Sequence, residues 1–510
     1  MATASGNILA NFAGRALTML MGVAFVPVYL KLLGIEAYGL IGFYTALQGV
    51  LVIADLGFSW TIARELAKGS RHSDGELRVA SLVRTIEVIY WIICISVGVL
   101  IVTAGGHLSD HWRSSAGLSP QTIHNAIQLM GLVLAVQMPA MFYQGGLNGL
   151  SRQITVNVII SIVATLRWAG AALVLWLIAP TIEAFFIWQI VVATISTAVS
   201  AWALWRLVPT EHVGARFDLG LMSDIWRFTL TVSGSALAGI MVTQIDKLVL
   251  SKLVSLEQFS YYSLATLISS LLYAIIGPIG IALYPGLSRL HAQNDNEKLA
   301  ALYHNGSQLL AIALIPAALV IIFFSHDLLL FWTGDAVTAA NTSLLVSLLT
   351  LGSLIYCLSG MANYLLIAAG WPGLSMAGNL ILGVVVIPTL LIFVPRYGAT
   401  AAAVAWIGTG SLYTLAVIPI MHQRLLRGHL MSWFFADTLI PLLVAFAVVA
   451  GARILMPGTD STLMRMFSLG LVWIVAVLCV GLVLPEVRRN VCRFMPLLSG
   501  DSLRGNRRSS

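Results

Sequence analysis

Four basic residues lie inside long apolar stretches of the sequence, where a charge needs a specific partner. They are Arg15, Arg84, Arg167 and Lys247. A guanidinium group presents two parallel N–H donors that match the oxygen atoms of a phosphate or a carboxylate. The pattern therefore predicts either a phosphate-binding cavity within a membrane or a set of internal ion pairs.

The depth of each basic residue in its apolar stretch decides between these roles. Arg167 lies about 20 Å along its stretch, close to the middle of a bilayer, and is expected to face a cavity or to form a structural ion pair. Arg15 has Asn11 one turn earlier on the same helix face. Its guanidinium could also extend to the lipid headgroups, and Lys247 has the same alternative.

Three carboxylates share these stretches and are candidate ion-coupling groups. Glu87 is three residues after Arg84, which places both on one helix face; they form either a neutralising pair or a carboxylate that releases the arginine or takes a proton. Asp246 either couples to an ion or is a structural carboxylate. Asp55 precedes Gly57, and a cap or turn contact is its alternative.

Amide side chains add a polar stripe to one further stretch. Gln137, Met141, Gln144 and Asn148 follow helical spacing around Pro139. Amides both donate and accept hydrogen bonds, so the stripe suits either a hydroxyl-rich sugar or hydrogen bonds between helices. The predicted substrate-binding set is Arg15, Arg84, Arg167, Lys247, Asn11, Gln137 and Gln144.

Apolar runs near the roughly 20 residues that cross a bilayer recur along the whole chain. The 510 residues are 59% hydrophobic and 10% charged, and the runs lack the alternation of a membrane barrel. We predict an all-α polytopic membrane protein with about 14 transmembrane helices. Their approximate bounds are 8–30, 38–62, 80–104, 121–145, 154–178, 182–206, 226–251, 259–284, 303–325, 342–368, 374–394, 398–421, 433–456 and 462–484.

The loops between these runs differ in charge. One alternate set, with the C-terminal tail, carries 18 Lys and Arg residues, and the other carries 6. The positive-inside rule places the first set and both termini in the cytoplasm.

Two stretches 221 residues apart are similar: Lys31–Leu51 and Lys252–Leu272. Gly149 with Gly370, Asn157 with Asn379, and the pair Trp188 and Arg206 with Trp406 and Arg424 continue the match. We predict two six-helix lobes in a parallel pseudo-two-fold repeat. The predicted parts are residues 1–206, residues 207–424, and residues 425–510 with the helix pair 13–14 and a basic cytoplasmic tail.

Composition and motifs argue against several classes of protein. The net charge of +7 is spread over loops and forms no nucleic-acid module. The four cysteines predict no structural disulfide, and no GxxxxGK[ST] loop indicates an ATP site. The first apolar run predicts a spanning helix, not a cleaved signal. We expect no cofactor and no enzymatic activity.

Three motifs give the chain a resemblance to a known family. The segments Leu33–Gly39 (LGIEAYG), Asp55–Leu66 (DLGFSWTIAREL) and Gln244–Lys247 (QIDK) resemble the polysaccharide transporter family of O-antigen-type flippases. This family belongs to the multidrug/oligosaccharidyl-lipid/polysaccharide exporter superfamily. The resemblance implies flipping of undecaprenyl-diphosphate-linked oligosaccharides from the cytoplasmic to the periplasmic leaflet, for surface polysaccharide or exopolysaccharide synthesis.

A mechanism follows from combining that resemblance with the in-span charges. We expect secondary transport by alternating access, with the isoprenoid tail left in membrane lipid and H⁺ or Na⁺ as the candidate counter-ion. A polymerase of the same pathway is a candidate partner. Alternatives are a lipid II flippase or a multidrug exporter of the same fold. A membrane polysaccharide polymerase or ligase is disfavoured, because the outer loops are short.

Overall fold

The computed structural model describes residues 17–52, 54–69, 76–112, 117–208, 216–218, 220, 243–456 and 462–484. Throughout these residues the regular structure is helical, without strands. Eleven of the helices are long and apolar enough to cross a membrane. The chain is therefore a polytopic all-helical membrane protein, as predicted.

Those eleven helices coincide with eleven of the predicted spans. The predicted spans 8–30 and 226–251 lie partly outside the described residues. The prediction of one span over 38–62 is wrong in detail, because the chain forms helix α3 (Ile35–Leu51) and helix α4 (Phe58–Gly69) with a turn between them. Leu56 and Gly57 in that turn have φ of 48° and 73°, a left-handed conformation that no helix continues through.

Contacts between Cα atoms divide the chain into two compact units. Unit 1 comprises Met1–Ser263 and Gly383–Ala399, and unit 2 comprises Leu264–Leu382 and Thr400–Ser510. The boundaries fall within helices α12 (Leu256–Ser270) and α18 (Gly373–Tyr397) and after the first residue of α19 (Ala399–Leu425). The division predicted from sequence, into residues 1–206, 207–424 and 425–510, and the repeat on which it is based stay predictions.

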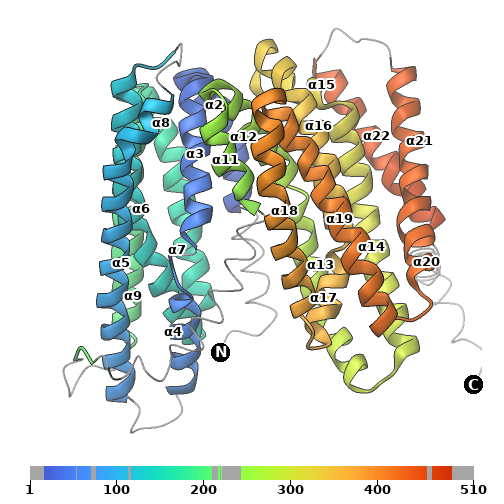
Figure 1. The fold of residues 1–510 in the computed structure, drawn as a ribbon, viewed down its shortest axis with the longest axis horizontal. Helices are drawn as coiled ribbons and strands as arrows, with labels where there is room; N and C mark the ends of the chain where they lie inside the picture. Colours follow the sequence, from blue (N-terminus) through green and yellow to red (C-terminus); the bar gives the residue numbers. More distant parts are fainter. Residues whose placement is uncertain are drawn as a thin grey trace, which may run out of the picture. The chain divides into compact units, whose positions relative to one another are not determined.

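Unit 1 is built around a row of long helices, in which α5, α6 and α9 lie side by side (Figure 1). Its helices are α2 (Val26–Leu33), α3, α4, α5 (Glu76–His111), α6 (Pro120–Gly149), α7 (Gln153–Thr165), the π-helical turn η2 (Leu166–Gly170), α8 (Ala171–Leu177), α9 (Ile182–Trp205) and α11 (Ile245–Leu253), with the first part of α12 and the end of α18.

Glycines let the helices of unit 1 approach closely. A Cβ atom on Gly98 of α5 would lie 3.1 Å from the carbonyl oxygen of Gly131 on α6. A Cβ atom on Gly145 of α6 would lie 2.4 Å from the carbonyl oxygen of Ser59 on α4. Small residues of this kind allow tight van der Waals packing between helices in a bilayer, where no hydrophobic force drives association.

The two similar stretches have the same local structure and pack against each other. In each, a helix ends, one or two residues interrupt it, and a second helix begins, at Ile35 and Leu256 respectively. A Cβ atom on Gly42 would lie 2.5 Å from the Ser263 hydroxyl, and the ring of Phe43 packs edge-on against that of Phe259. Small residues on α3 therefore allow it to approach the first part of α12 closely.

Unit 2 packs around helix α14 (Asn296–Phe323), whose residues Leu310, Leu314 and Ile315 are fully buried. Helices α13, α16, α21 and α22 contact it. The elements are α13 (Tyr273–Ala292), α14, α15 (Ser325–Thr333), α16 (Ala336–Leu358), α17 (Gly360–Ala368), α19 (Ala399–Leu425), α20 (Leu430–Ser432), the π-helical turn η4 (Trp433–Leu439), α21 (Ile440–Leu455) and α22 (Thr462–Val483).

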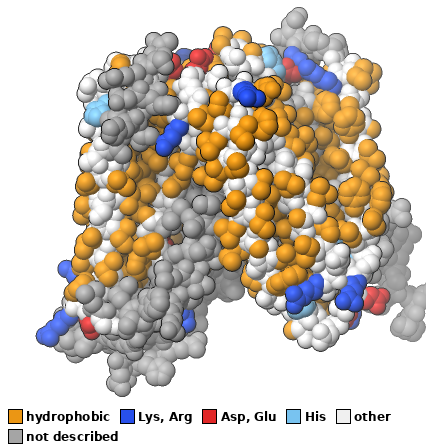
Figure 2. Space-filling view, in the orientation of Figure 1, with side chains coloured by type: hydrophobic (Ala, Val, Ile, Leu, Met, Phe, Trp, Pro, Cys, Tyr) orange, Lys and Arg blue, Asp and Glu red, His pale blue; other side chains and the backbone are white. Residues whose placement is uncertain are grey.

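The surface has the polarity of a membrane protein. On the face in view, hydrophobic side chains cover the middle of the helices, and Lys and Arg side chains lie towards their ends (Figure 2). Many large apolar side chains are exposed, among them Trp176, Ile178 and Leu415. Contact with lipid tails explains the exposure of these apolar side chains. Charged side chains lie towards the helix ends because they are costly within the hydrocarbon region.

The close approach of α6 to α4 yields a stability prediction. Gly145→Ala places a methyl group against the Ser59 carbonyl oxygen, which belongs to the backbone and cannot turn aside. We expect a loss of about 1–3 kcal/mol from overpacking, seen as a lower melting temperature in detergent micelles. Gly277→Ala is the control, because no atom lies within 4 Å of its added Cβ. Equal melting temperatures for the two variants would contradict the packing.

Candidate functional site

The π-helical turn η2 interrupts the span Gln153–Leu177 near its middle, and it carries Arg167. Arg167 lies about 21 Å along this span at 1.5 Å per residue. A π-turn hydrogen-bonds to the fifth residue instead of the fourth, so some carbonyl groups lose their α-helical partners. Such turns are rare and occur frequently at functional sites.

Side chains of neighbouring helices occupy the carbonyl groups of η2. The Trp188 indole donates to the Leu166 carbonyl oxygen at 2.8 Å, and the Gln189 amide donates to that of Arg167 at 3.3 Å. The Tyr29 hydroxyl donates to the Trp168 carbonyl oxygen at 2.6 Å. Helices α2 and α9 thus hold the turn in place, and its backbone is satisfied inside the membrane as a bilayer requires.

The Arg167 side chain, by contrast, has no carboxylate partner within the described ranges. It is half-buried, and its Nε atom is buried without a hydrogen-bond partner. Among the residues that the structure describes, none forms an ion pair with its guanidinium group. The predicted alternative, a structural ion pair, is therefore not seen in the described part of the chain. An uncompensated guanidinium at this depth is a ready anion-binding group.

Hydroxyl and amide groups of α3 and α6 surround the same region. Tyr44 interacts electrostatically with Arg167. The Tyr44 hydroxyl donates to Gln137 Oε1 at 2.8 Å, and Gln48 Nε2 lies 2.9 Å from both the Tyr44 hydroxyl and Gln137 Oε1. Gln189 Oε1 is buried without a partner. We call Tyr44, Gln48, Gln137, Arg167 and Gln189 the η2 cluster.

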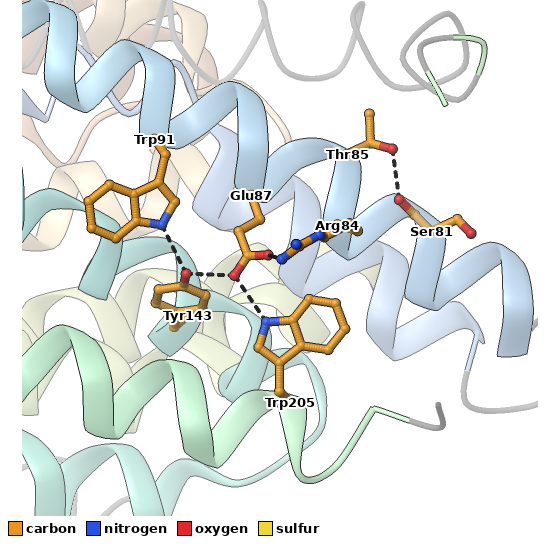
Figure 3. Close-up of polar contacts among 7 residues, drawn as sticks. All are labelled: Ser81, Arg84, Thr85, Glu87, Trp91, Tyr143 and Trp205. Carbon is orange, nitrogen blue, oxygen red and sulfur yellow. Dashed lines mark hydrogen bonds and ion pairs between the residues drawn. The ribbon is translucent and has the colours of Figure 1, made fainter. Parts of the chain in front are cut away.

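The predicted ion pair of Arg84 and Glu87 is present, and it is part of a larger network (Figure 3). The Arg84 guanidinium lies 2.7 Å from the Glu87 carboxylate. The other Glu87 oxygen accepts hydrogen bonds from the Tyr143 hydroxyl at 2.7 Å and the Trp205 indole at 3.0 Å. Trp91 donates in turn to Tyr143. Glu87 thus ties α5 to α6 and α9, while the Arg84 side chain is 52% exposed.

Asp55 forms the turn contact that was the alternative to its coupling role. Its carboxylate accepts hydrogen bonds from the Tyr90 hydroxyl at 2.7 Å and from the Ser59 hydroxyl and backbone N–H. These donors satisfy the buried carboxylate and hold the start of α4 against α5. The geometry favours a structural role.

Asp246 and Lys247 have separate partners, as expected for neighbouring residues on a helix. Asp246 is buried; one carboxylate oxygen accepts from the Tyr262 hydroxyl at 2.6 Å, and the other has no partner in the part of the chain that the structure describes. The Lys247 ammonium donates to Gln244 Oε1 and to the Thr243 carbonyl oxygen. Asp246 therefore keeps one oxygen atom available to a cation or proton.

Two of the predicted residues are not described by the structure, and the site contains residues that were not predicted. Arg15 and Asn11 lie outside the described residues. Gln144 is half-buried and, within the described ranges, makes no side-chain hydrogen bond. The predicted substrate-binding set did not include Tyr44, Gln48 and Gln189. The spacing of Tyr44 and Gln48 by four residues places both on one helix face, which was the available signal.

The fold is shared with solved transporters. A structure of the lipid II flippase MurJ in an inward closed conformation matches with a TM-score of 0.69 and 15% identity, covering 94% of this chain and 98% of that one. A multidrug resistance MATE family transporter of the MOP superfamily, inward-facing, matches with a TM-score of 0.66 and 15% identity, covering 81% of this chain and 96% of that one. The chain thus has the fold of the MOP-superfamily flippases and exporters.

Family models agree with this fold. The model "Polysaccharide biosynthesis protein" matches residues 5–291, more than half of the chain, and the model MatE matches residues 233–392. The chain belongs to the polysaccharide biosynthesis protein family. A probable lipid II flippase MurJ from Rhizobium tropici is 26% identical over 326 residues, which cover 57% of this chain and 58% of that relative.

The Glu87 network yields a second stability prediction. Glu87→Ala removes the acceptor of the Tyr143 and Trp205 donors, and a buried donor without a partner costs about 1–3 kcal/mol. We expect a clearly lower melting temperature in detergent micelles. Arg84→Ala should cost less, because the half-exposed guanidinium is partly solvated already. A larger loss for Arg84→Ala than for Glu87→Ala would contradict this account.

Proposed function

We propose that this protein is a secondary transporter that flips undecaprenyl-diphosphate-linked oligosaccharide repeat units. Transport runs from the cytoplasmic to the periplasmic leaflet of the bacterial inner membrane by alternating access, with both termini cytoplasmic, and serves surface polysaccharide or exopolysaccharide synthesis. The single observation that carries the proposal is the Arg167 guanidinium, halfway along a membrane span and without a carboxylate partner among the described residues.

The chemistry of the η2 cluster suits both parts of such a substrate. A guanidinium binds phosphoryl oxygens through parallel N–H donors. The amides of Gln48, Gln137 and Gln189 and the hydroxyl of Tyr44 can each donate and accept, which matches sugar hydroxyl groups. The buried, unpartnered Oε1 atom of Gln189 is an acceptor that a sugar hydroxyl would satisfy.

The charge of this cluster argues against a drug exporter. A cationic drug would require a carboxylate or an aromatic face near its charge. The η2 cluster contains one cation and no carboxylate. An uncompensated positive charge repels organic cations and attracts anions, so a diphosphate-bearing lipid is the better substrate.

A lipid II flippase is the second candidate, and the likeness to MurJ proteins favours it. Both candidates share a phosphate-bearing lipid as substrate, and they differ in the sugar. Competition distinguishes them: a transporter of oligosaccharide units is inhibited by unlabelled undecaprenyl-diphosphate oligosaccharide more strongly than by lipid II.

Arg167→Ala tests the phosphate-binding role. Proteoliposomes containing fluorescently labelled undecaprenyl-diphosphate oligosaccharide report flipping through quenching of the outer leaflet. We expect at least about a tenfold lower initial rate, because one charge-assisted contact is worth about 1.5–3 kcal/mol. Arg167→Lys should be intermediate, since lysine keeps the charge and loses the planar fork.

Arg152→Ala is the matched control. Arg152 is an exposed arginine between α6 and α7, outside the η2 cluster, and its loss should leave the rate unchanged. An unchanged rate for Arg167→Ala, in protein with a normal melting curve, would remove Arg167 from the binding site and refute the proposal.

The membrane potential should drive this transport. A diphosphate carries about two negative charges, and each is worth about 2.3 kcal/mol per 100 mV. Outward transfer from a negative interior therefore gains roughly 5 kcal/mol per 100 mV if no counter-ion compensates the charge. We expect a potassium–valinomycin potential, negative on the cytoplasmic side, to accelerate flipping, and the reversed potential to slow it. Equal rates under both potentials would refute electrogenic transport.

A further inference from the structure

A second buried polar cluster lies in unit 2 and contains two histidines and a carboxylate. His304 and Gln308 are on α14, His429 precedes α20, and Asp437 is in the π-helical turn η4. His304 Nδ1 lies 2.5 Å from one oxygen of Asp437, and Gln308 Nε2 donates to the other at 2.8 Å. His304 Nε2 lies 3.0 Å from His429 Nδ1. The four side chains thus form one continuous chain of hydrogen bonds.

Burial increases step by step along this chain. The side chain of His429 is half-buried, that of His304 is 12% exposed, and that of Asp437 is 1% exposed. His429 lies in the loop that the distribution of Lys and Arg places on the cytoplasmic side. The cluster therefore connects a solvated loop to a carboxylate inside the helical bundle.

The described part of the chain supplies no Lys or Arg partner to Asp437. Among the described residues, its only polar side-chain partners are His304 and Gln308. The Lys and Arg residues close in sequence to His304 and His429 have other contacts: Lys298 pairs with Asp295, Arg427 donates to the Gln423 carbonyl oxygen, and Arg424 stacks on Trp371. A buried carboxylate without a fixed counter-charge is strongly disfavoured, so a proton shared with His304 is the compensating charge.

The other titratable groups around the pair provide no fixed charge either. Tyr303 of α14 packs edge-on between the rings of His304 and His422. His422 of α19 has Nδ1 2.9 Å from the Ile418 carbonyl oxygen, so this nitrogen carries the hydrogen. The net charge of this region therefore depends on how many protons Asp437 and the histidines His304, His422 and His429 hold.

We propose that His304 and Asp437 form a proton-binding site that exchanges with the cytoplasm through His429 and couples proton movement to transport. An incoming proton binds His429 Nε2, and the hydrogen on Nδ1 passes to His304 Nε2. The hydrogen on His304 Nδ1 then passes to Asp437. Each imidazole accepts a proton on one nitrogen and donates from the other, so charge moves without displacement of the rings.

The coupling part of this inference rests on the proposed secondary transport, whereas the binding of the proton does not. Two experiments separate them. The first is a potentiometric titration of the purified protein in detergent between pH 5 and pH 8. Asp437→Asn keeps the size of the side chain and removes the charge that stabilises a proton on His304. Its amide oxygen can accept one of the two hydrogen bonds, and its NH₂ group cannot accept the other. We expect this variant to bind about one proton fewer than the wild type over that range.

The control for this titration is His326→Gln, which removes a half-exposed histidine next to Asp327 at another part of unit 2. It removes one histidine outside the cluster and leaves the His304–Asp437 pair intact, so it calibrates the change in proton uptake that the loss of a single side chain produces. Equal proton uptake by Asp437→Asn and the wild type would overturn the proposed site, whatever the protein transports.

The second experiment measures flipping of the labelled undecaprenyl-diphosphate oligosaccharide under an imposed pH difference, with the potential clamped at zero by valinomycin and potassium. For one coupled proton, each pH unit shifts the final ratio between leaflets about tenfold. We expect Asp437→Asn and His304→Gln to lose this shift while retaining flipping without a gradient, and His326→Gln to keep it.

The outcomes are distinguishable. A wild type that flips the lipid without responding to the pH difference refutes the coupling and leaves the proposed function intact. A wild type that flips nothing refutes the proposed function, and the titration alone then decides whether His304 and Asp437 bind a proton. If either variant melts early, the other carries the test, because they alter different helical elements.

Discussion

The structure depends on one constraint: a polar group inside a bilayer has to find its partner within the protein. Glu87 shows the constraint fully met, because its two oxygen atoms receive donors from Arg84, Tyr143 and Trp205. The same constraint explains why the carbonyl groups of η2 are occupied by side chains of α2 and α9. Helices that expose mostly apolar surface to lipid are held in register by these few polar contacts.

A few buried polar groups lack such a partner among the described residues, and these groups are candidates for binding a substrate or an ion. Three buried atoms have no partner among the residues that the structure describes: the Arg167 Nε atom, one Asp246 oxygen and Gln189 Oε1. Each is costly in a dry environment, so a substrate, an ion or water would stabilise it. Arg84 and Arg167 therefore have different roles, although the sequence presents both as arginines within apolar runs. The first is neutralised by a neighbour on its own helix, and the second is not.

The sequence allows accurate prediction of those features that depend on nearby residues. The eleven confirmed spans follow from local hydropathy, and the Arg84–Glu87 pair follows from a spacing of three residues on one helix. The family was also recognised from short motifs, and a family model covering residues 5–291 confirms it. Hydropathy alone does not show the turn at Leu56 and Gly57, because most residues on either side of it are apolar. The signal for a turn is the pair Asp55 and Gly57, where a turn contact is one of the predicted alternatives.

The two polar clusters could not be predicted, because their members come from helices far apart in the chain. Tyr44 and Gln137 are separated by 93 residues, and His304 and Asp437 by 133. No spacing rule connects residues at such distances. The π-helical turns add a further difficulty, because they rotate the residues that follow by about one position relative to an α-helix, and no simple sequence pattern announces them.

The π-turn η2 also affects how the two halves of the predicted internal duplication would be aligned. A π-turn accommodates an extra residue in a helix that still crosses the same thickness of lipid. The offset between matched residues is 222 for Asn157 and Asn379, and 218 for Trp188 and Trp406, on either side of η2. One residue inserted in the first half, and accommodated by the π-turn η2, accounts for part of the difference between these two offsets. A gap placed inside a membrane helix is therefore physically reasonable here, and an alignment that forbids gaps within helices would pair the wrong faces of the two halves.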